Sequence, residues 1–177
     1  YGLKHPQEDK IVSYLKTLDL EKLILSKDFI KAYAAQVANY VYWAYQLEVG
    51  DWRAALNVAF QKAYPNDKDE KLSKSQFQNK IYGLTHIVIA ASEYYRSTIS
   101  EETFGWIIDY FTANIDRIVD KTKSDVHAEV GISYLLVNRK NDMSLLRLQK
   151  EVVKAIDPEK NMILSVKGDD DISKGEH

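Results

Sequence analysis

Hydrophobic residues recur at helical spacing along most of the chain, and the segment over residues 26–48 shows this most clearly. One stripe consists of Ile30, Tyr33, Val37, Tyr40, Ala44 and Leu47. A second stripe consists of Ala34, Ala38, Val41 and Tyr45. A helix with two apolar stripes packs against neighbours on two sides, so we expect the helix over 26–48 to be internal. An additional chain covering this helix is one way to bury the second stripe.

Turn and capping residues divide the rest of the chain into further helices. Gly50 ends the first segment, and Pro65 breaks the chain after the next one. Ser100 and Asp142 are typical N-cap residues, because their side-chain oxygens accept hydrogen bonds from the free N–H groups of a first turn. The pattern predicts these helices over about residues 6–18, 51–64, 75–97, 100–121, 124–139 and 142–156.

These elements predict an all-α fold with about six to seven helices arranged as successive helical hairpins. The hairpins span about residues 26–64, 74–121 and 124–156, either as an irregular multi-helical bundle or as an α/α array. We assign residues 1–156 to a single α-helical domain and residues 157–177 to an extended C-terminal segment. Capping residue types at Asp171 and Ser173 indicate that this segment is either a chain end or the lead-in to further chain.

Composition excludes several classes of chemistry. The chain has 177 residues, a net charge of −2 and no cysteine, which excludes disulfides, thiolate nucleophiles and cysteine-ligated metals. There is no basic excess to neutralise phosphates, so we expect no nucleic-acid partner. No apolar run approaches the roughly 18 residues of a membrane span. The first residue is Tyr, which we interpret as the mature end of an exported protein, a trimmed cytosolic chain being the alternative.

No metal or cofactor motif is present. The histidines at 5, 86, 127 and 177 lack paired metal-ligand spacing. The acidic run over 169–176 resembles a calcium loop, but Lys174 stands where the loop needs Gly. Phosphate-loop and dinucleotide fingerprints are also missing. The sequence therefore predicts neither a metal site nor a cofactor.

Two helices carry residues suited to acid–base catalysis. The helix over 124–138, which we expect to be buried, carries His127 and Glu129, and Asp125 lies one turn before Glu129. The helix over 75–97 places His86 and Glu93 on one side. Glutamate and histidine are the usual general acids and bases, so these four residues, His86, Glu93, His127 and Glu129, are the candidate catalytic residues. The structural alternative is that the acids suit a helix N-terminus and that the histidines belong to the core.

Aromatic residues are the remaining signal, because Tyr and Trp suit surfaces that are apolar on one side and wet on the other. Trp106 and Tyr110 lie one turn apart, away from the main apolar stripe of their helix, with Arg117 on the same side. The candidate ligand-binding residues are Trp106, Tyr110, Arg117, Tyr82 and Tyr134. Filling of a helical core is the alternative use of the same residues.

The function that these observations favour is a non-catalytic binding or interaction module. Its partner would be a protein, a polar small molecule or a carbohydrate. The alternative is an α/α-type enzyme, a carbohydrate-active hydrolase or lyase that uses Glu and His as acid and base. A small helical assembly or toxin-neutralising protein is a third possibility, which rests on analogy between fold classes.

Overall fold

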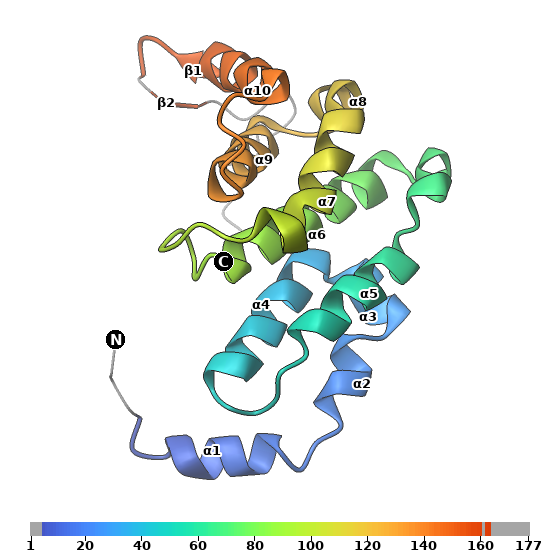
Figure 1. Cartoon of the computed structure of the whole chain (residues 1–177), viewed down its shortest axis with the longest axis vertical. Helices are drawn as coiled ribbons and strands as arrows, with labels where there is room; N and C mark the ends of the chain where they lie inside the picture. Colours follow the sequence, from blue (N-terminus) through green and yellow to red (C-terminus); the bar gives the residue numbers. More distant parts are fainter. Residues whose placement is uncertain (1–4, 161, 164–177) are drawn as a thin grey trace. The chain divides into compact units, whose positions relative to one another are not determined.

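The computed structural model describes residues 5–160 and 162–163, and this part of the chain is all-α, as predicted (Figure 1). The helices are α1 (Glu8–Leu15), α2 (Leu20–Ile24), α3 (Lys27–Ala32), α4 (Ala34–Gln46), α5 (Arg53–Ala63), the 3-10 helix η1 (Asn66–Lys71), α6 (Lys74–Ala91), α7 (Glu101–Ala113), α8 (Ile115–Lys121), α9 (Ser124–Leu136) and α10 (Met143–Lys154). A short antiparallel pair of strands follows, β1 (Ile156–Asp157) and β2 (Met162–Ile163), with Ile156 opposite Ile163. The expected features at residues 164–177 lie outside the described residues.

The number of helices corrects the sequence prediction of six to seven, because the described part alone contains ten α-helices and η1. Two predicted helices are each broken once. Tyr33, at φ −134° and ψ 42°, separates α3 from α4, and Asn114, at φ −117° and ψ 17°, separates α7 from α8. The Asn114 side-chain amide donates to the Tyr110 carbonyl at 2.9 Å, a local bond that competes with helix propagation. Hydrophobic periodicity continues across both breaks, so it did not reveal them.

The chain divides into two compact units, residues 1–91 (unit 1) and residues 92–177 (unit 2). Each unit is described by itself below. The assignment of residues 1–156 to one domain stays a prediction, because two compact units can belong to a single domain.

The core of unit 1 is built where α4 packs against α6. Val37, Ala38 and Val41 on α4 are completely buried, so part of the predicted double stripe is covered by this chain itself. Gly83 on α6 permits the close approach of the helices. A Cβ atom at Gly83 would lie 2.5 Å from the Phe60 ring and 2.8 Å from the Ala34 Cβ.

A buried ion pair fastens η1 to α6 in the same unit. The Lys80 Nζ lies 2.7 Å from the Asp69 Oδ1 and donates to the Asn66 Oδ1 at 2.8 Å. The side chains of Lys80 and Asp69 are 1% and 7% exposed. Charges this deeply buried are tolerated only when they are paired, so this contact fixes the position of the loop that follows α5.

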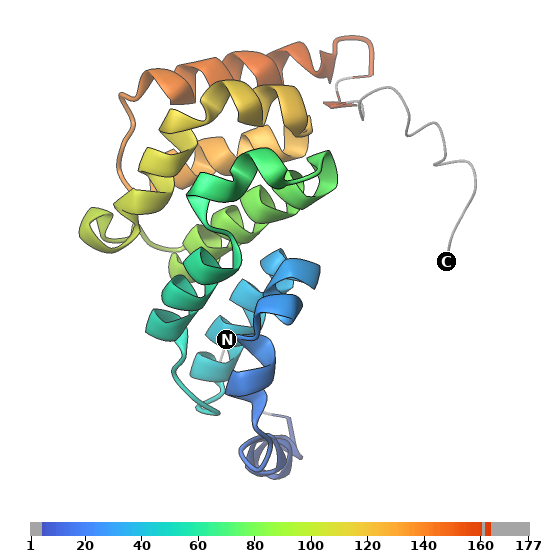
Figure 2. The ribbon, with the colours of Figure 1, turned by 90° about the vertical axis from the view of Figure 1, so that its right-hand side faces the viewer.

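In unit 2, α9 packs against α10, and α10 also contacts α8 (Figure 2). Val126, Val130 and Tyr134 on α9 are completely buried, and Leu145 and Leu148 form the facing side of α10. No helix in residues 5–160 combines the length and hydrophobicity that a membrane span requires.

Candidate functional site

His127 is the most unusual of the predicted catalytic residues. Its side chain belongs to α9 and is 7% exposed, and its Nε2 is buried without a hydrogen-bond partner. Burial holds the pKa of His127 below its usual value of 6.5. Hydrogen bonds to the backbone of Ile118 and Val119 oppose this shift of the pKa, as do the charges of Glu151 and Asp125. His127 is therefore a buried ring whose surroundings favour the neutral form, and one of its nitrogens has no partner.

The other three predicted catalytic residues have different surroundings. His86 lies on α6 in unit 1, half-buried, with its Nδ1 3.4 Å from the Asn39 Nδ2. In unit 2, Glu129 is half-buried, and the pKa of the Tyr95 phenol is raised by burial and, to a smaller extent, by the negative charge of Glu129. Glu93 is exposed, with its carboxylate 4.0 Å from the Arg96 guanidinium. Within unit 2 the His127 ring thus lies against α8, whereas Glu129 faces Tyr95.

The helix predicted over residues 75–97 ends early, at Ala91, which corrects the prediction that Glu93 stands on its polar face. Glu93, Tyr94 and Tyr95 have φ angles of 54°, 56° and 71°, so they form a left-handed turn. Each such residue costs roughly 1–2 kcal/mol. The buried Ser92 offsets part of this, because its hydroxyl accepts from the Tyr95 N–H at 2.9 Å and its carbonyl accepts from the Arg96 N–H at 2.9 Å.

The expected exposed patch of Trp106, Tyr110 and Arg117 is not present as such. Tyr110 is only 5% exposed, while Trp106 and Arg117 are half-buried. Tyr82 is half-buried on α6 in unit 1. Tyr134 is completely buried, and its hydroxyl bonds the Thr112 Oγ1 at 2.9 Å. Tyr110 and Tyr134 therefore follow the alternative interpretation, in which aromatic residues fill the core.

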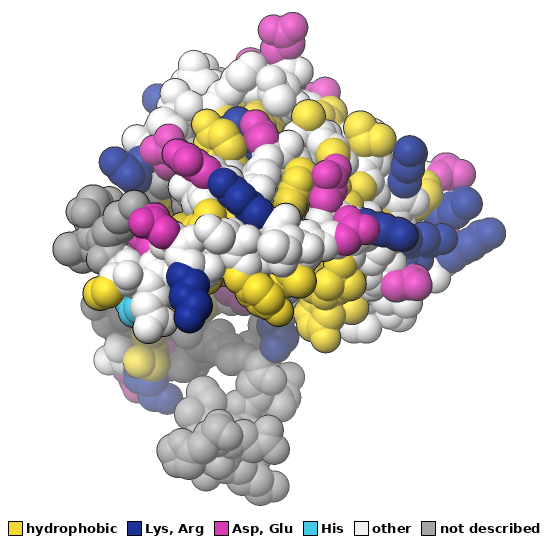
Figure 3. All heavy atoms as spheres, turned by 90° about the horizontal axis from the view of Figure 1, so that it is seen from below, with side chains coloured by type: hydrophobic (Ala, Val, Ile, Leu, Met, Phe, Trp, Pro, Cys, Tyr) yellow, Lys and Arg dark blue, Asp and Glu magenta, His cyan; other side chains and the backbone are white. Residues whose placement is uncertain are grey.

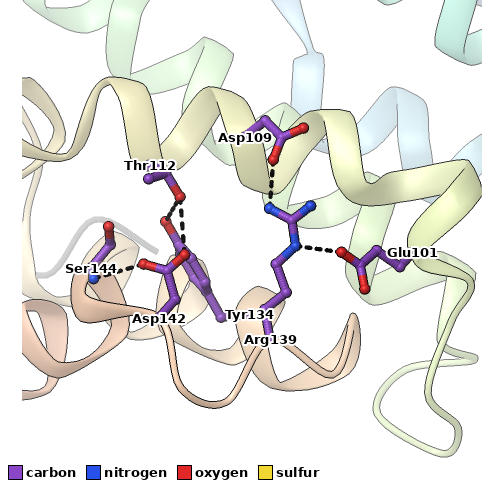
Figure 4. A network of polar contacts seen from close by, with 7 residues as sticks. All are labelled: Glu101, Asp109, Thr112, Tyr134, Arg139, Asp142 and Ser144. Carbon is purple, nitrogen blue, oxygen red and sulfur yellow. Dashed lines mark hydrogen bonds and ion pairs between the residues drawn. The ribbon is translucent and has the colours of Figure 1, made fainter.

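A polar network surrounds Tyr134 and holds the loop between α9 and α10 against α7 (Figure 4). Arg139 donates to Glu101 at 2.8 Å and also binds Asp109. Asp142 caps α10 by accepting from the Ser144 N–H at 2.8 Å, and its other oxygen lies 3.4 Å from the Thr112 Oγ1. Every residue drawn has a partner within the network, so we assign it a structural role.

An apolar groove of about 240 Å³ lies between α9 and α10. It is lined by His127, Ala128, Gly131, Ile132 and Leu135 from α9 and by Leu145, Leu148, Gln149, Val152 and Val153 from α10. Only His127 and Gln149 in this lining are polar. The sequence pattern did not reveal that α10 supplies the opposite wall.

A row of exposed aromatic side chains in unit 1 was also not singled out as a site. We call Phe29, Tyr33, Tyr40 and Trp43 the aromatic strip. Tyr33, Tyr40 and Trp43 are 51%, 38% and 45% exposed. Neighbouring ring centroids are 5.1 Å apart for Phe29 and Tyr33, 6.4 Å for Phe29 and Tyr40, and 5.9 Å for Tyr40 and Trp43. The strip is therefore a continuous surface of rings running from α3 along α4.

Hydrophobic side chains reach the molecular surface elsewhere as well. On the face shown in Figure 3 they form separate groups with charged side chains between them. No group of three or more potential metal-ligating residues occurs in the described part of the chain.

Of three comparisons with known proteins, only the comparison with protein families found a match. The sequence profile of the family described as domain of unknown function (DUF3541) matches residues 1–177. Comparison with curated proteins found no match, and comparison with solved structures found none either.

Proposed function

The chain belongs to the DUF3541 family, and we propose that it is a protein-binding module whose partner docks on the aromatic strip of unit 1. The family description names no activity, so the proposal rests on the exposure of these rings. The sequence predicts an additional chain that covers the helix over 26–48. We propose that this partner contacts only one side of α4.

The two sides of α4 explain this choice. Ala34, Val37, Ala38 and Val41 turn inward and are completely buried, whereas Tyr40 and Trp43 remain substantially exposed. Soluble proteins expose large contiguous apolar patches rarely, and such patches mark interaction sites. Tyr and Trp are also the residues that most often dominate the energy of protein interfaces.

The ring geometry favours a protein partner over a sugar. The planes of successive rings are tilted by 50°, 49° and 60°. Coplanar rings would offer a flat platform for a sugar face, whereas tilted rings form an uneven surface. The side chains of a partner protein fit an uneven surface better than a flat sugar ring does. Binding of a carbohydrate or another polar small molecule stays a prediction without support from this surface, as does catalysis by the four predicted residues.

Site-specific photo-crosslinking tests the proposal. A benzophenone amino acid replaces Tyr40 in one variant and Tyr14 in a control, because Tyr14 is a 63% exposed tyrosine on α1 that lies outside the strip. We expect a protein crosslinked from position 40 and not from position 14. Identical crosslinked products from both positions would contradict the proposal.

The protein identified in this way is then purified and its affinity measured by calorimetry. Trp43→Ala should weaken binding by about 30-fold, the loss expected of an interface hot spot, while Tyr14→Ala leaves it unchanged. Equal affinities for Trp43→Ala and the unsubstituted chain would refute docking on the strip. Matching far-UV circular dichroism spectra establish that both variants fold.

A further inference from the structure

The exposed side of α4 carries a regular row of residues that extends beyond the aromatic strip. Tyr33, Gln36, Tyr40, Trp43 and Leu47 follow one another at steps of three and four residues, and each of them is exposed. Because an α-helix has 3.6 residues per turn, residues at these steps lie close to one line along its surface. We call these five residues the α4 row. Tyr33 and Leu47 are the N-cap and C-cap residues of α4, so the row runs along the whole helix.

The α4 row carries no charge, which is unusual for an exposed side of a helix. Residues 32–47 contain no Asp, Glu, Lys or Arg, although these four residue types make up 28% of the chain. The side of a surface helix that faces water normally carries charged residues. The exposed side of α4 instead has the composition of the centre of a protein interface, where charged residues are depleted and Tyr and Trp are enriched. Steps of three and four residues are also those at which two helices packed lengthwise contact one another.

The exposed area of the row indicates the size of the partner element that it fits. The exposed fractions of Tyr33, Tyr40 and Trp43 correspond to about 300 Å² in total, at about 200 Å² for a whole aromatic side chain. A stable complex of two globular surfaces buries about 800 Å² on each partner. Two copies of this chain that met through their α4 rows alone would fall well short of this area. A single helix of another protein, about 20 Å long like the row itself, matches it in size.

We infer that the partner contacts the α4 row with one amphipathic α-helix, which lies lengthwise along α4 and presents an uncharged stripe to it. This inference rests on the proposed function and adds the secondary structure and the chemistry of the partner segment. Apolar side chains of the partner helix cover the rings of Tyr40 and Trp43. Near Gln36 the partner helix excludes water and supplies no charge.

Photo-crosslinking from three positions of the row tests this geometry. A benzophenone amino acid replaces Tyr33, Tyr40 or Leu47, which are seven residues apart in sequence and about 10 Å apart along α4. Mass spectrometry identifies the crosslinked residue of the partner for each position. We expect these residues to lie on one segment of the partner, about seven residues apart, because a helix advances 1.5 Å per residue. A spacing of about three residues would overturn the inference, because an extended segment advances about 3.3 Å per residue.

Two other products would also overturn the inference. They are crosslinks to separate segments of the partner and a covalent dimer of this chain. In both cases a protein still docks on the aromatic strip, so the proposed function stands while the inference fails. If position 40 gives no crosslink, or gives the same products as the control position 14, the proposed function fails together with the inference.

Charge substitutions at Gln36 test the uncharged stripe, with affinity for the protein crosslinked from position 40 measured by calorimetry. Gln36→Glu and Gln36→Lys should each weaken binding by about tenfold or more, because either charge is buried without a partner. Gln61→Glu and Gln61→Lys are the matched controls, since Gln61 is exposed on α5 and lies outside the row, and they should leave the affinity unchanged. Unchanged or tighter binding by either Gln36 variant would overturn the inference.

The fold of the variants is checked separately. Glutamate and lysine are close to glutamine in helix propensity, so all four substitutions should leave the far-UV circular dichroism spectrum unchanged. If a Gln36 variant does not fold, the spacing of the crosslinked residues in the partner still decides the question.

Discussion

Replacing each of two helical glycines by alanine should change stability in opposite directions. At Gly83 the new methyl group would lie 2.8 Å from the Ala34 Cβ and 2.5 Å from the Phe60 ring. Carbon atoms prefer separations of about 3.5–4.0 Å, so α4 and α6 would have to move apart by roughly 1 Å. The Ala34 Cβ is fixed to its backbone and cannot rotate away. Phe60 is 1% exposed, so its ring has no open space to enter.

The expected size of each effect follows from two opposing contributions. Alanine in place of glycine gains roughly 1 kcal/mol in helix propensity at either position. Overpacking at Gly83 costs about 1–3 kcal/mol, and the rigid neighbours favour the upper end of this range. We therefore expect Gly83→Ala to lower the free energy of unfolding by about 2 kcal/mol. Gly131→Ala meets only ordinary packing distances, so it should raise that free energy by about 0.5–1 kcal/mol.

Thermal unfolding followed by circular dichroism measures both variants. The expected changes are a fall in Tm of about 4–8 °C for Gly83→Ala and a rise of about 2 °C for Gly131→Ala. In a Trp106→Phe background, the fluorescence of Trp43 and Trp52 reports on unit 1 alone. Shifts of the same sign in the two variants would refute the assignment of Gly83 as the close-contact glycine.

Three further predictions concern polar and charged side chains. Asp69→Ala removes the buried carboxylate that pairs with Lys80 and should reduce the free energy of unfolding by about 3–5 kcal/mol. Asp69→Leu combined with Lys80→Met removes both charges and should reduce it by less. Urea titrations of the two variants distinguish the effect of a buried ion pair from a loss of packing. Asp142→Ala removes the N-cap of α10 and should lower the free energy of unfolding by about 1 kcal/mol, measured as a fall in Tm of about 2–4 °C. Asp142→Asn should retain most of the stability, because asparagine is also a good N-cap residue. The pKa of His127 is lower in the folded than in the unfolded chain, so below about pH 6.5 the unfolded chain binds a proton that the folded chain excludes. The free energy of unfolding should therefore fall between pH 7.5 and pH 5.5. An equal fall in His127→Phe would contradict this assignment.

The all-α class could be predicted because hydrophobic spacing reports directly on helices. The same spacing could not locate the breaks at Tyr33 and Asn114, since an apolar stripe continues across a break of one residue. It also could not show that the helix after Lys74 ends at Ala91. That end depends on hydrogen bonds to the buried Ser92, and a serine near a helix end is too common to indicate a left-handed turn.

The side of α4 that stays exposed could not be predicted for a related reason. Both stripes of the helix over 26–48 are apolar, and composition alone favours burying both. The structure buries the small residues Ala34 and Ala38, because their size lets α4 approach α6 closely near Gly83. Rings as large as those of Tyr40 and Trp43 would hold the two helices apart. The buried side therefore does not coincide with either predicted stripe, because Val37 of the first stripe is buried together with Ala34 and Ala38 of the second, whereas Tyr40 of the first stripe is exposed.

His127 shows what sequence reasoning about a candidate site can and cannot supply. Histidine next to Glu129 in sequence favoured an acid–base pair, but residues two positions apart on a helix point in different directions. The contacts of His127 come from α8, about ten residues earlier, and the groove beside it is completed by α10, about twenty residues later. The helices packed around His127, rather than its neighbours in sequence, therefore determine its surroundings.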